Sequence, residues 1–197
     1  AEIIITIFMF IFGISFTLYY QALKGNWKVI FKDEEFRFYV GTMAAAIILM
    51  TINLTGTIFS SVWESLRHAS FQAGSLMSTT GYATTDFNLW PTFSKVVLFF
   101  LMLIGGSAGS TAGGLKCIRI VLLFKIIKRE VIKVIHPKSV FTVKVGGRAL
   151  DEKIVSGVTS YLSAYMMIFA TALLIVSLDG FDLITTFTSV ATTISNV

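Results

Sequence analysis

The sequence predicts an all-α membrane protein with four transmembrane helices and two half-length helices that enter the membrane and return on the same side. Three observations lead to this fold class. Of the 197 residues, 55% are hydrophobic and only 14% are charged, whereas a soluble domain carries about 25% charged residues. Long apolar segments recur along the chain, and polar segments too short to cross a bilayer lie between them. Proline is scarce, with two residues, as suits long helices.

Four apolar segments are long enough to cross a hydrocarbon core of about 30 Å. They run from Ile3 to about Leu23, from Phe38 to about Ile58, from Val96 to Phe124 and from Ile154 to Leu178. The third is interrupted in its middle. The order of span, half-helix and polar strand occurs twice, roughly 115 residues apart, which indicates a repeat of architecture. The chain begins inside an apolar run and ends inside a polar one, so we expect it to be part of a longer polypeptide.

Lysine and arginine gather on one side of the predicted membrane. The loop at 24–37 holds four of them and the segment at 116–153 holds ten, whereas the opposite side holds two. By the positive-inside rule, both basic segments face the cytoplasm, and 59–95 and 179–197 face outside. Five acidic residues on the outer side form either a cation-attracting mouth or only a solvated rim. They are Glu2, Glu64, Asp86, Asp179 and Asp182.

The stretch SLMSTTGYATTD at 75–86 is the centre of the predicted architecture. A helix that begins at Ser61, in a capping box with Glu64, leads into it and aims the negative end of its dipole at a cation. We expect three residues to present backbone carbonyls that replace the water around the ion. They are Thr79, Thr80 and Gly81. Because Gly81 can take backbone angles closed to other residues, the stretch predicts a potassium-selective pore loop; an ordinary outer loop with a glycine turn is the alternative.

Two charged or titratable residues of this half-helix have simpler interpretations. Arg67 follows Glu64 by three residues, so we expect a local ion pair on one helix face. His68 has no evident partner, and a packed or exposed histidine is favoured over a pH sensor. A second half-helix is predicted from Asp179-Gly180-Phe181-Asp182 to the polar strand ATTISNV at 191–197.

The third span contains five glycines among ten residues. They lie in the stretch Gly105, Gly106, Ser107, Ala108, Gly109, Ser110, Thr111, Ala112, Gly113 and Gly114. Each glycine in a helix costs about 1 kcal/mol relative to alanine, so we expect a broken helix whose unwound middle lies under the filter and acts as a gate. A glycine zipper is the alternative, because positions 105, 109 and 113 share one helix face. A phosphate-binding loop is excluded, because Lys116 follows Gly114-Leu115 without the Gly-Lys-Ser/Thr order.

The chain then leaves the membrane as a helix with one basic and one apolar face. The basic face comprises Lys125, Lys128, Arg129, Lys133 and His136. Anionic lipid is its simplest partner, and a cytosolic subunit is the more specific alternative. Residues 140–145 alternate before Gly146-Gly147, which predicts a small hairpin. The basic residues flank apolar spans rather than form a patch with stacking aromatics, so nucleic acid is not an expected partner.

Four motifs resemble the TrkH/TrkG/KtrB family of bacterial potassium-uptake proteins. They are STTGYATTDF at 78–87, GGSAGSTAGGLK at 105–116, HPK at 136–138 and ATTISNV at 191–197. Such proteins fold four span–pore-loop–span repeats, related to those of potassium channels, around one pseudo-fourfold pore. The resemblance implies that 1–23 is the last helix of a second repeat, 24–37 a cytoplasmic loop, 38–136 a complete third repeat, 137–153 a cytoplasmic hairpin and 154–197 the start of a fourth.

The resemblance also implies a site, a location and partners. Potassium would be the transported ion, and its filter would include Thr79, Thr80, Gly81, Asn196 and Val197, with the fourth repeat's glycine one residue further on. The stretch 105–114 would be the intramembrane gating loop. Similar proteins lie in the bacterial cytoplasmic (inner) membrane, form homodimers and bind a cytosolic nucleotide-binding ring of TrkA or KtrA type, which 116–153 is placed to meet. No organic cofactor is expected in this chain.

Two other classes of function fit the sequence less well. A subunit of a tetrameric cation channel needs one filter loop, whereas this chain carries two dissimilar ones. A membrane-embedded enzyme needs a nucleophile, a base or a metal cluster, whereas the two histidines and the single cysteine are scattered. We therefore expect a symporter or channel rather than an enzyme. A complete carbonyl ring needs four loops, so these 197 residues alone should not conduct.

Overall fold

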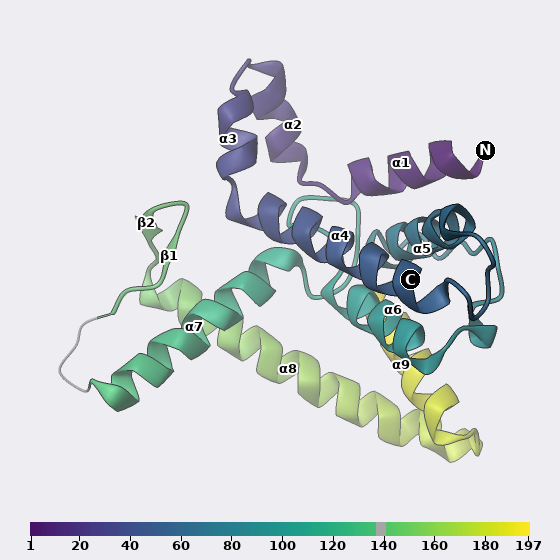
Figure 1. Cartoon of the computed structure of the whole chain (residues 1–197). Helices are drawn as coiled ribbons and strands as arrows, with labels where there is room; N and C mark the ends of the chain where they lie inside the picture. The colour runs from purple at the N-terminus through teal and green to yellow at the C-terminus, as the bar shows by residue number, and fades with distance from the viewer. Residues whose placement is uncertain (137–140) are drawn as a thin grey trace.

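The computed structural model describes residues 1–136 and 141–197, and its regular structure is almost entirely helical (Figure 1), which confirms the predicted fold class. The α-helices are α1 (Glu2–Phe12), α2 (Phe16–Leu23), α3 (Trp27–Lys32), α4 (Glu34–Leu54), α5 (Val62–Met77), α6 (Thr92–Ile104), α7 (Cys117–Ile135), α8 (Glu152–Val176) and α9 (Leu183–Ser195). Single 3-10 turns lie at Phe87–Leu89 and Ser177–Asp179. Strands β1 (Lys144–Val145) and β2 (Arg148–Ala149) form one antiparallel hairpin.

Of the four predicted spans, two are continuous helices and two are broken. α4 and α8 are each long and apolar enough to cross a membrane. α1 and α2 would together make a further span, but they meet at 91°. The continuous helix expected over residues 3–23 is therefore wrong. The bend is fixed by close packing at Gly13, because a Cβ there would lie 2.2 Å from the hydroxyl oxygen of Tyr39, and that hydroxyl donates a hydrogen bond to the Phe10 carbonyl at 3.1 Å.

The interruption of the third predicted span is confirmed. α6 ends at Ile104, α7 begins at Cys117, and the residues between them are not helical. The second predicted span also differs at its start, because α4 begins at Glu34, inside the segment expected to be a loop. Asp33 explains this early start. Its carboxylate accepts the amide of Phe36 at 2.8 Å, which satisfies one of the unpaired donors at the helix N-terminus.

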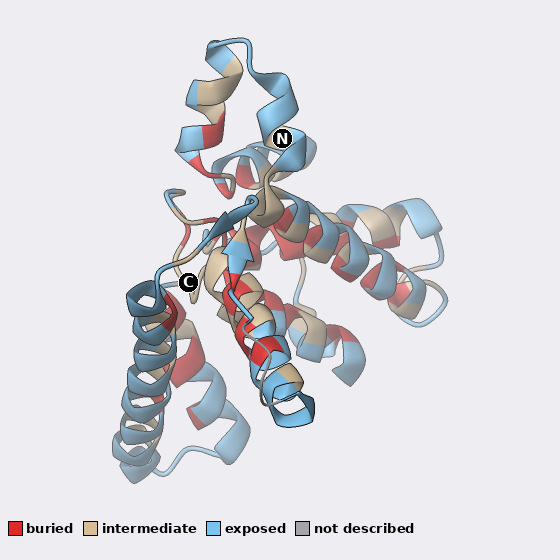
Figure 2. Cartoon of the chain, turned by 90° about the vertical axis from the view of Figure 1, so that its left-hand side faces the viewer, coloured by how far each residue is buried: buried red, intermediate tan, exposed pale blue. Residues whose placement is uncertain are grey.

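The main core forms where α5 packs against α1, α4 and α6. Figure 2 shows that buried residues gather in the middle of the molecule, whereas the helices that project from it are largely exposed. Most residues of α5 are buried, including the polar Ser65, Gln72 and Ser75. Neighbouring helices cover these polar groups, although the Gln72 Oε1 and the Ser75 hydroxyl have no hydrogen-bond partner among the described residues. The predicted half-helix is thus enclosed by its neighbours.

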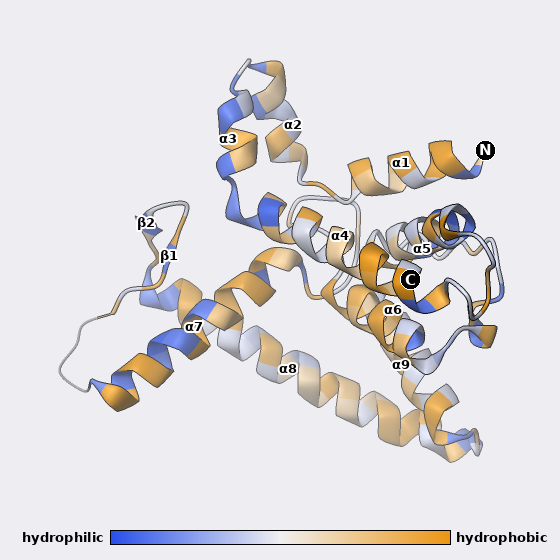
Figure 3. Cartoon of the chain, viewed as in Figure 1, coloured by the Kyte–Doolittle hydropathy of each residue, from blue (hydrophilic) through white to orange (hydrophobic). Residues whose placement is uncertain are grey.

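α8 and α9 form a second unit beside this core. α9 packs on α8 and α6 through a small apolar cluster that includes Met102, Phe169, Val190 and Ala191. The rest of α8 is uncovered: only 6% of its most apolar window is buried. Figure 3 shows the apolar colouring along α8. An uncovered helix this apolar is typical of a lipid-facing span.

The segment after the glycine-rich stretch packs as a third unit. Leu122 and Ile126 of α7 form a cluster with Val143 and Val155, which lie on either side of the hairpin. The hairpin is shorter than expected, because the strand pairing covers 144–145 and 148–149 only. Val140 of the expected strand, and Pro137 and Lys138 of the HPK motif, lie outside the described residues.

The two half-helices begin differently. Ser61 is the N-cap residue of α5, but its side chain makes no capping hydrogen bond, so the predicted capping box with Glu64 is wrong. Asp182 does cap α9: its carboxylate accepts the amide of Thr185 at 3.1 Å and the Thr185 hydroxyl at 2.5 Å.

Candidate functional site

The two half-helices α5 and α9 end in the same way. Thr79 and Asn196 both have left-handed backbones, with φ of 55° and 59°. In each case the next amide reaches back to a carbonyl in the last helical turn. These bonds join Thr80 to Ser75 at 2.8 Å and Val197 to Thr192 at 3.2 Å. Together with the left-handed residue they make a Schellman turn. The two ends therefore correspond residue by residue, Thr79 with Asn196 and Thr80 with Val197.

Thr79 is the more unusual of the two turn residues. A left-handed backbone is uncommon outside glycine and asparagine, and for a β-branched residue it is strained. The strained residue is held by a specific contact, because its hydroxyl oxygen accepts the amide of Gly113 at 2.7 Å. Strain of this kind persists only where the surroundings fix it, and here the glycine-rich segment supplies the contact.

The glycine-rich segment is a closed loop. Its two ends pair with each other, because the Leu115 amide donates to the Leu103 carbonyl at 3.0 Å and the Lys116 amide to the Ile104 carbonyl at 2.9 Å. Gly105 lies so close to the other end that a Cβ on it would be 2.3 Å from the Gly113 carbonyl oxygen. The glycine-zipper alternative is therefore wrong, because a zipper needs a continuous helix through these residues.

The loop contacts both half-helix ends. Gly113 donates to Thr79, as described, and the neighbouring Gly114 amide donates to the Ser195 carbonyl at 3.1 Å. The ends also approach each other, since a Cβ on Gly81 would lie 3.6 Å from the carbonyl carbon of Val197. Three segments that the sequence singled out separately, 79–81, 105–114 and 195–197, thus meet in one place.

Exposure differs among the predicted site residues. Thr80, Gly81 and Asn196 are exposed, whereas Thr79 and Val197 are partly buried. Within the loop, four residues are buried and two are exposed. The buried ones are Gly105, Gly106, Ser107 and Ala112, and the exposed ones are Gly109 and Thr111. A hollow lies beside the exposed part; Thr80 and Thr111 line one side of it, and the apolar side chains of Phe8 and Phe12 of α1 line the other.

Three further hydrogen bonds of the loop were not predicted from the sequence. The bend between α1 and α2 holds it from one side: the Ser107 amide donates to the Gly13 carbonyl at 2.9 Å, and the Phe16 amide donates to the Gly109 carbonyl at 3.0 Å. From another side, the carboxylate of Glu35 accepts the amide of Ala108 at 2.6 Å. In the sequence, the bend is indicated only by Gly13 and Ser15, a small residue and a polar one that interrupt an apolar run.

Two residues of α5 that the sequence also singled out, Arg67 and His68, make contacts within the chain. Arg67 pairs with Glu2 at 3.5 Å between Nε and Oε2, so the predicted pair with Glu64 is wrong. Of the two expectations for His68, packed or exposed, the structure shows the first: His68 is buried and its ring stacks on Phe59, with 4.8 Å between centroids.

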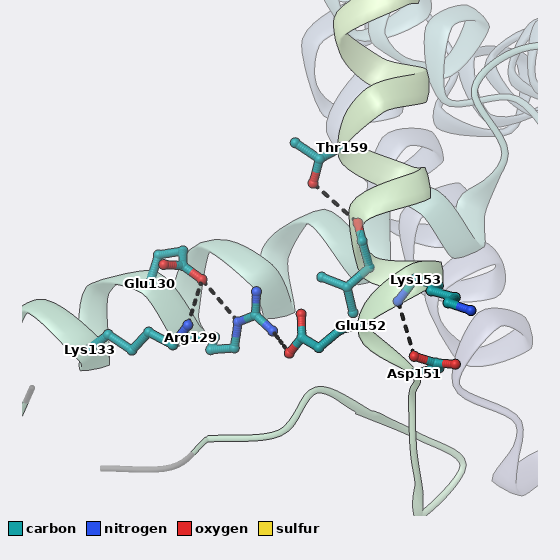
Figure 4. Close-up of polar contacts among 8 residues, drawn as sticks. Arg129, Glu130, Lys133, Asp151, Glu152, Lys153 and Thr159 are labelled. Carbon is teal, nitrogen blue, oxygen red and sulfur yellow. Dashed lines mark hydrogen bonds and ion pairs between the residues drawn. The ribbon is translucent and has the colours of Figure 1, made fainter. Parts of the chain in front are cut away.

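The basic face of α7 is partly used inside the chain (Figure 4). Arg129 is buried; its Nη1 lies 2.7 Å from the Glu152 carboxylate at the start of α8, and its Nε lies 3.0 Å from Glu130. Lys133 lies 3.5 Å from the same Glu130 carboxylate. Of the predicted basic face, Arg129 therefore fastens α7 to α8 and is not available to lipid or a partner. Lys128 is exposed.

Comparison with known proteins identifies the family. The family described as "TrkH: Cation transport protein" matches residues 1–197. The Trk system potassium uptake protein TrkH of Salmonella typhimurium is 39% identical over 98% of this chain and 41% of its own length. TrkG of Escherichia coli is 30% identical over 100% of this chain and 41% of its own length.

A solved structure agrees with the sequence comparison. The crystal structure of the potassium transporter TrkH from Vibrio parahaemolyticus superimposes with a TM-score of 0.92, at 36% identity, and covers 99% of this chain and 42% of that one. This chain spans about two fifths of the length of the relatives it matches. With a match over all its residues, the chain belongs to the TrkH family of cation transport proteins.

Proposed function

We propose that this chain forms part of the potassium-conducting pore of a Trk-type uptake system. The observation that carries the proposal is the meeting of two equivalent helix ends, with Gly81 beside Val197. The last carbonyls of a helix have no helical partner, and the helix dipole puts about half a negative charge there. Two such ends directed at one place create a site that favours a cation.

The filter is assigned to the residues that follow these two helix ends. Thr79, Thr80 and Gly81 form one loop, and Asn196 and Val197 form the equivalent part of the next, so their backbone carbonyls would replace the hydration shell of potassium. The exposure of Thr80, Gly81 and Asn196 fits this role, because carbonyls that bind an ion need an open side. Two further loops would complete the ring, as the greater length of the relatives allows.

The gate is assigned to the glycine-rich loop, 105–114. Its contacts support this role: Gly113 binds the filter residue Thr79, Gly114 binds Ser195, the residue just before the filter residue Asn196, and Thr111 shares a hollow with the filter residue Thr80. A closed loop of small residues can move without rebuilding a packed core, because few side chains have to be displaced.

The membrane orientation follows from where the basic segments lie. α4 and α8 both begin near the hairpin and α7 and both run toward the opposite side (Figure 1). Glu34 at the start of α4 and Lys125 of α7 form an ion pair, so the two basic segments lie on one side of the molecule. We assign 24–37 and 116–153 to the cytoplasm and 59–95 and 179–197 to the outside of a bacterial inner membrane. A homodimer and a cytosolic nucleotide-binding subunit of TrkA or KtrA type complete the proposed assembly.

The test is cation-selective uptake by a full-length transporter that contains this chain, expressed in bacteria without their own potassium import. Rubidium uptake is measured in competition with potassium and with sodium. We expect potassium to compete far better than sodium, and Gly81→Ser to reduce this preference. Gly180→Ser is the matched control, because both glycines have φ near +78° (+78° and +77°) and a Cβ at 180 meets nothing within 4 Å. Equal competition by sodium and potassium in the unaltered transporter would refute the proposal.

A further inference from the structure

Two adjacent carboxylates at the start of α4 bind different parts of the chain. Glu35 binds the glycine-rich loop and the start of α7. One oxygen of its carboxylate accepts the amide of Ala108 at 2.6 Å and the amide of Ile118 at 3.0 Å. Ala108 lies within the glycine-rich loop, and Ile118 lies in the first turn of α7. A single side chain therefore holds the loop on one side and the helix that leaves it on the other.

Glu34 holds the hairpin. One of its carboxylate oxygens accepts the amide of Gly146 at 3.2 Å, in the turn between β1 and β2. The other oxygen is bound to the ammonium group of Lys125, on α7. The same ammonium donates to the carbonyl of Lys144 at 2.6 Å. The hairpin is thus tied to α4 and α7 by one carboxylate and one lysine.

The positions of Glu34 and Glu35 link the contact with the hairpin to the contact with the loop. Glu34 and Glu35 occupy successive positions in one helical turn, whose start is fixed by the Asp33 cap. A shift of the hairpin that pulls on Glu34 must therefore move or rotate the turn that carries Glu35. On the loop, the amide of Ala108 has the Glu35 carboxylate as its acceptor, so a displaced Glu35 removes that bond.

We propose that Glu34 and Glu35 couple the position of the hairpin at 144–149 to the conformation of the glycine-rich loop, with Glu35 as the positioning residue. This inference rests on the proposed role of the loop as the gate. It gives a protein that binds the cytoplasmic side a physical route to the gate: a load on the hairpin acts through Lys125 and Glu34 on α4, and through Glu35 on the loop.

The experiment measures loop exposure directly. A full-length transporter containing this chain carries Thr111→Cys, since Thr111 is exposed, and no other cysteine except the buried Cys117. The rate of reaction with a water-soluble maleimide is compared among variants, and the rate of the same variants without Thr111→Cys is subtracted. The variants are Glu35→Ala, Glu35→Gln, Glu34→Ala and Lys125→Gln. Lys128→Gln is the matched control, because it removes the same charge three residues along α7 from an exposed position.

We expect Glu35→Ala to raise the labelling rate about tenfold, because two amides lose a charged acceptor. Glu35→Gln keeps one carbonyl acceptor and should give a smaller increase. Glu34→Ala and Lys125→Gln should each raise the rate several-fold, and adding Glu34→Ala to Glu35→Ala should add nothing further, since the route from the hairpin is already cut. Only variants that elute as a single folded species are compared, so the milder Glu35→Gln stands in if Glu35→Ala fails to fold.

Three results would overturn the proposal. Unchanged labelling in both Glu35 variants would show that this carboxylate does not hold the loop. A rise in the Glu35 variants with no change in Glu34→Ala and Lys125→Gln would show that nothing is transmitted from the hairpin. If Lys128→Gln raised the labelling rate as much as Lys125→Gln, the loss of a positive charge on α7 would explain the effect without the contact to Glu34. Labelling requires no ion transport, so a failure of potassium-selective uptake would refute the proposed function without deciding this test, and the reverse also holds.

Discussion

Replacing Gly113 with alanine should disturb the proposed filter, although Gly113 is not one of its residues. A Cβ at 113 would lie 2.1 Å from the carbonyl oxygen of Ser195, 3.2 Å from its carbonyl carbon and 3.3 Å from the Cβ of Asn196. Carbon and oxygen atoms normally approach no closer than about 3.3 Å, so the overlap with the oxygen exceeds about 1 Å. Backbone atoms of Ser195 make the closest contacts, and rotating a side chain cannot relieve them.

Two contributions set the expected decrease in stability. Overpacking of this kind costs about 1–3 kcal/mol. The loop and α9 can separate only by breaking the bond from the Gly114 amide to the same Ser195 carbonyl, which contributes about 1 kcal/mol. The φ of Gly113 is not among the positive values found in this loop, so alanine adds no backbone strain of its own. We therefore expect a cost of roughly 2–4 kcal/mol, concentrated at the second filter segment.

Two measurements on a full-length transporter containing this chain check this prediction. Thermal unfolding of the purified protein should begin at a lower temperature, and sodium should compete better against rubidium uptake. Gly41→Ala is the control, because it lies within α4 and its added Cβ meets nothing within 4 Å. If Gly113→Ala unfolds at the same temperature and has the same ion selectivity as Gly41→Ala, the loop and Ser195 are not in contact. The assignment of the loop as a gate would then lose its main support.

Three smaller predictions concern the loop, the ion pair between α7 and α8, and the cap at the start of α9. Shortening the loop within 105–114 should raise ion flux, because the proposed gate is removed; unchanged flux would leave the loop with a packing role only. Arg129→Met should lower the free energy of unfolding by about 1 kcal/mol, as the exposed carboxylate of Glu152 limits the ion pair, and Lys128→Met should not. Hydrogen bonds from the Thr185 hydroxyl and amide hold the pKa of Asp182 below its usual range. Because this pKa is lower in the folded state, the cap stabilises α9 above about pH 4, and the contribution is lost as the pH falls through the folded-state pKa. Protection of the Thr185 amide, measured as hydrogen exchange relative to the intrinsic rate at each pH, should fall on acidification, and Asp182→Ala should lower it at neutral pH as well.

The helical fold and the break at 105–116 were predictable because their causes are local. Glycine density alone makes a helix through 105–114 unfavourable, and the structure has none there. The length of α5 was predictable for a similar reason: its apolar and small residues stop at the polar run that begins with Ser78. Neither inference required knowledge of which parts of the chain meet.

The remaining features depend on contacts between distant residues, which no local pattern encodes. Arg67 had a plausible partner three residues away in Glu64, but the bend between α1 and α2 brings Glu2 within reach instead. The Schellman turn at Thr79 lacks the glycine that normally announces one; its left-handed backbone is held by Gly113, which comes 34 residues later. The bond from Ala108 to Glu35 spans 73 residues.

The way the loop's amides are satisfied constrains how it can move. Four of them donate to partners on four different segments: Ser107 to the bend at Gly13, Ala108 to α4, Gly113 to Thr79 after α5, and Gly114 to Ser195 at the end of α9. A buried amide without a partner costs about 1–3 kcal/mol, and no single rigid shift of the loop keeps all four bonds. If the loop is the gate, its opening must therefore supply new acceptors, and in a pore that conducts a cation the acceptor at hand is water. The loop would then open at the same time as water enters the path below the proposed filter. The free energy cost of opening falls as water enters, because water replaces the lost acceptors.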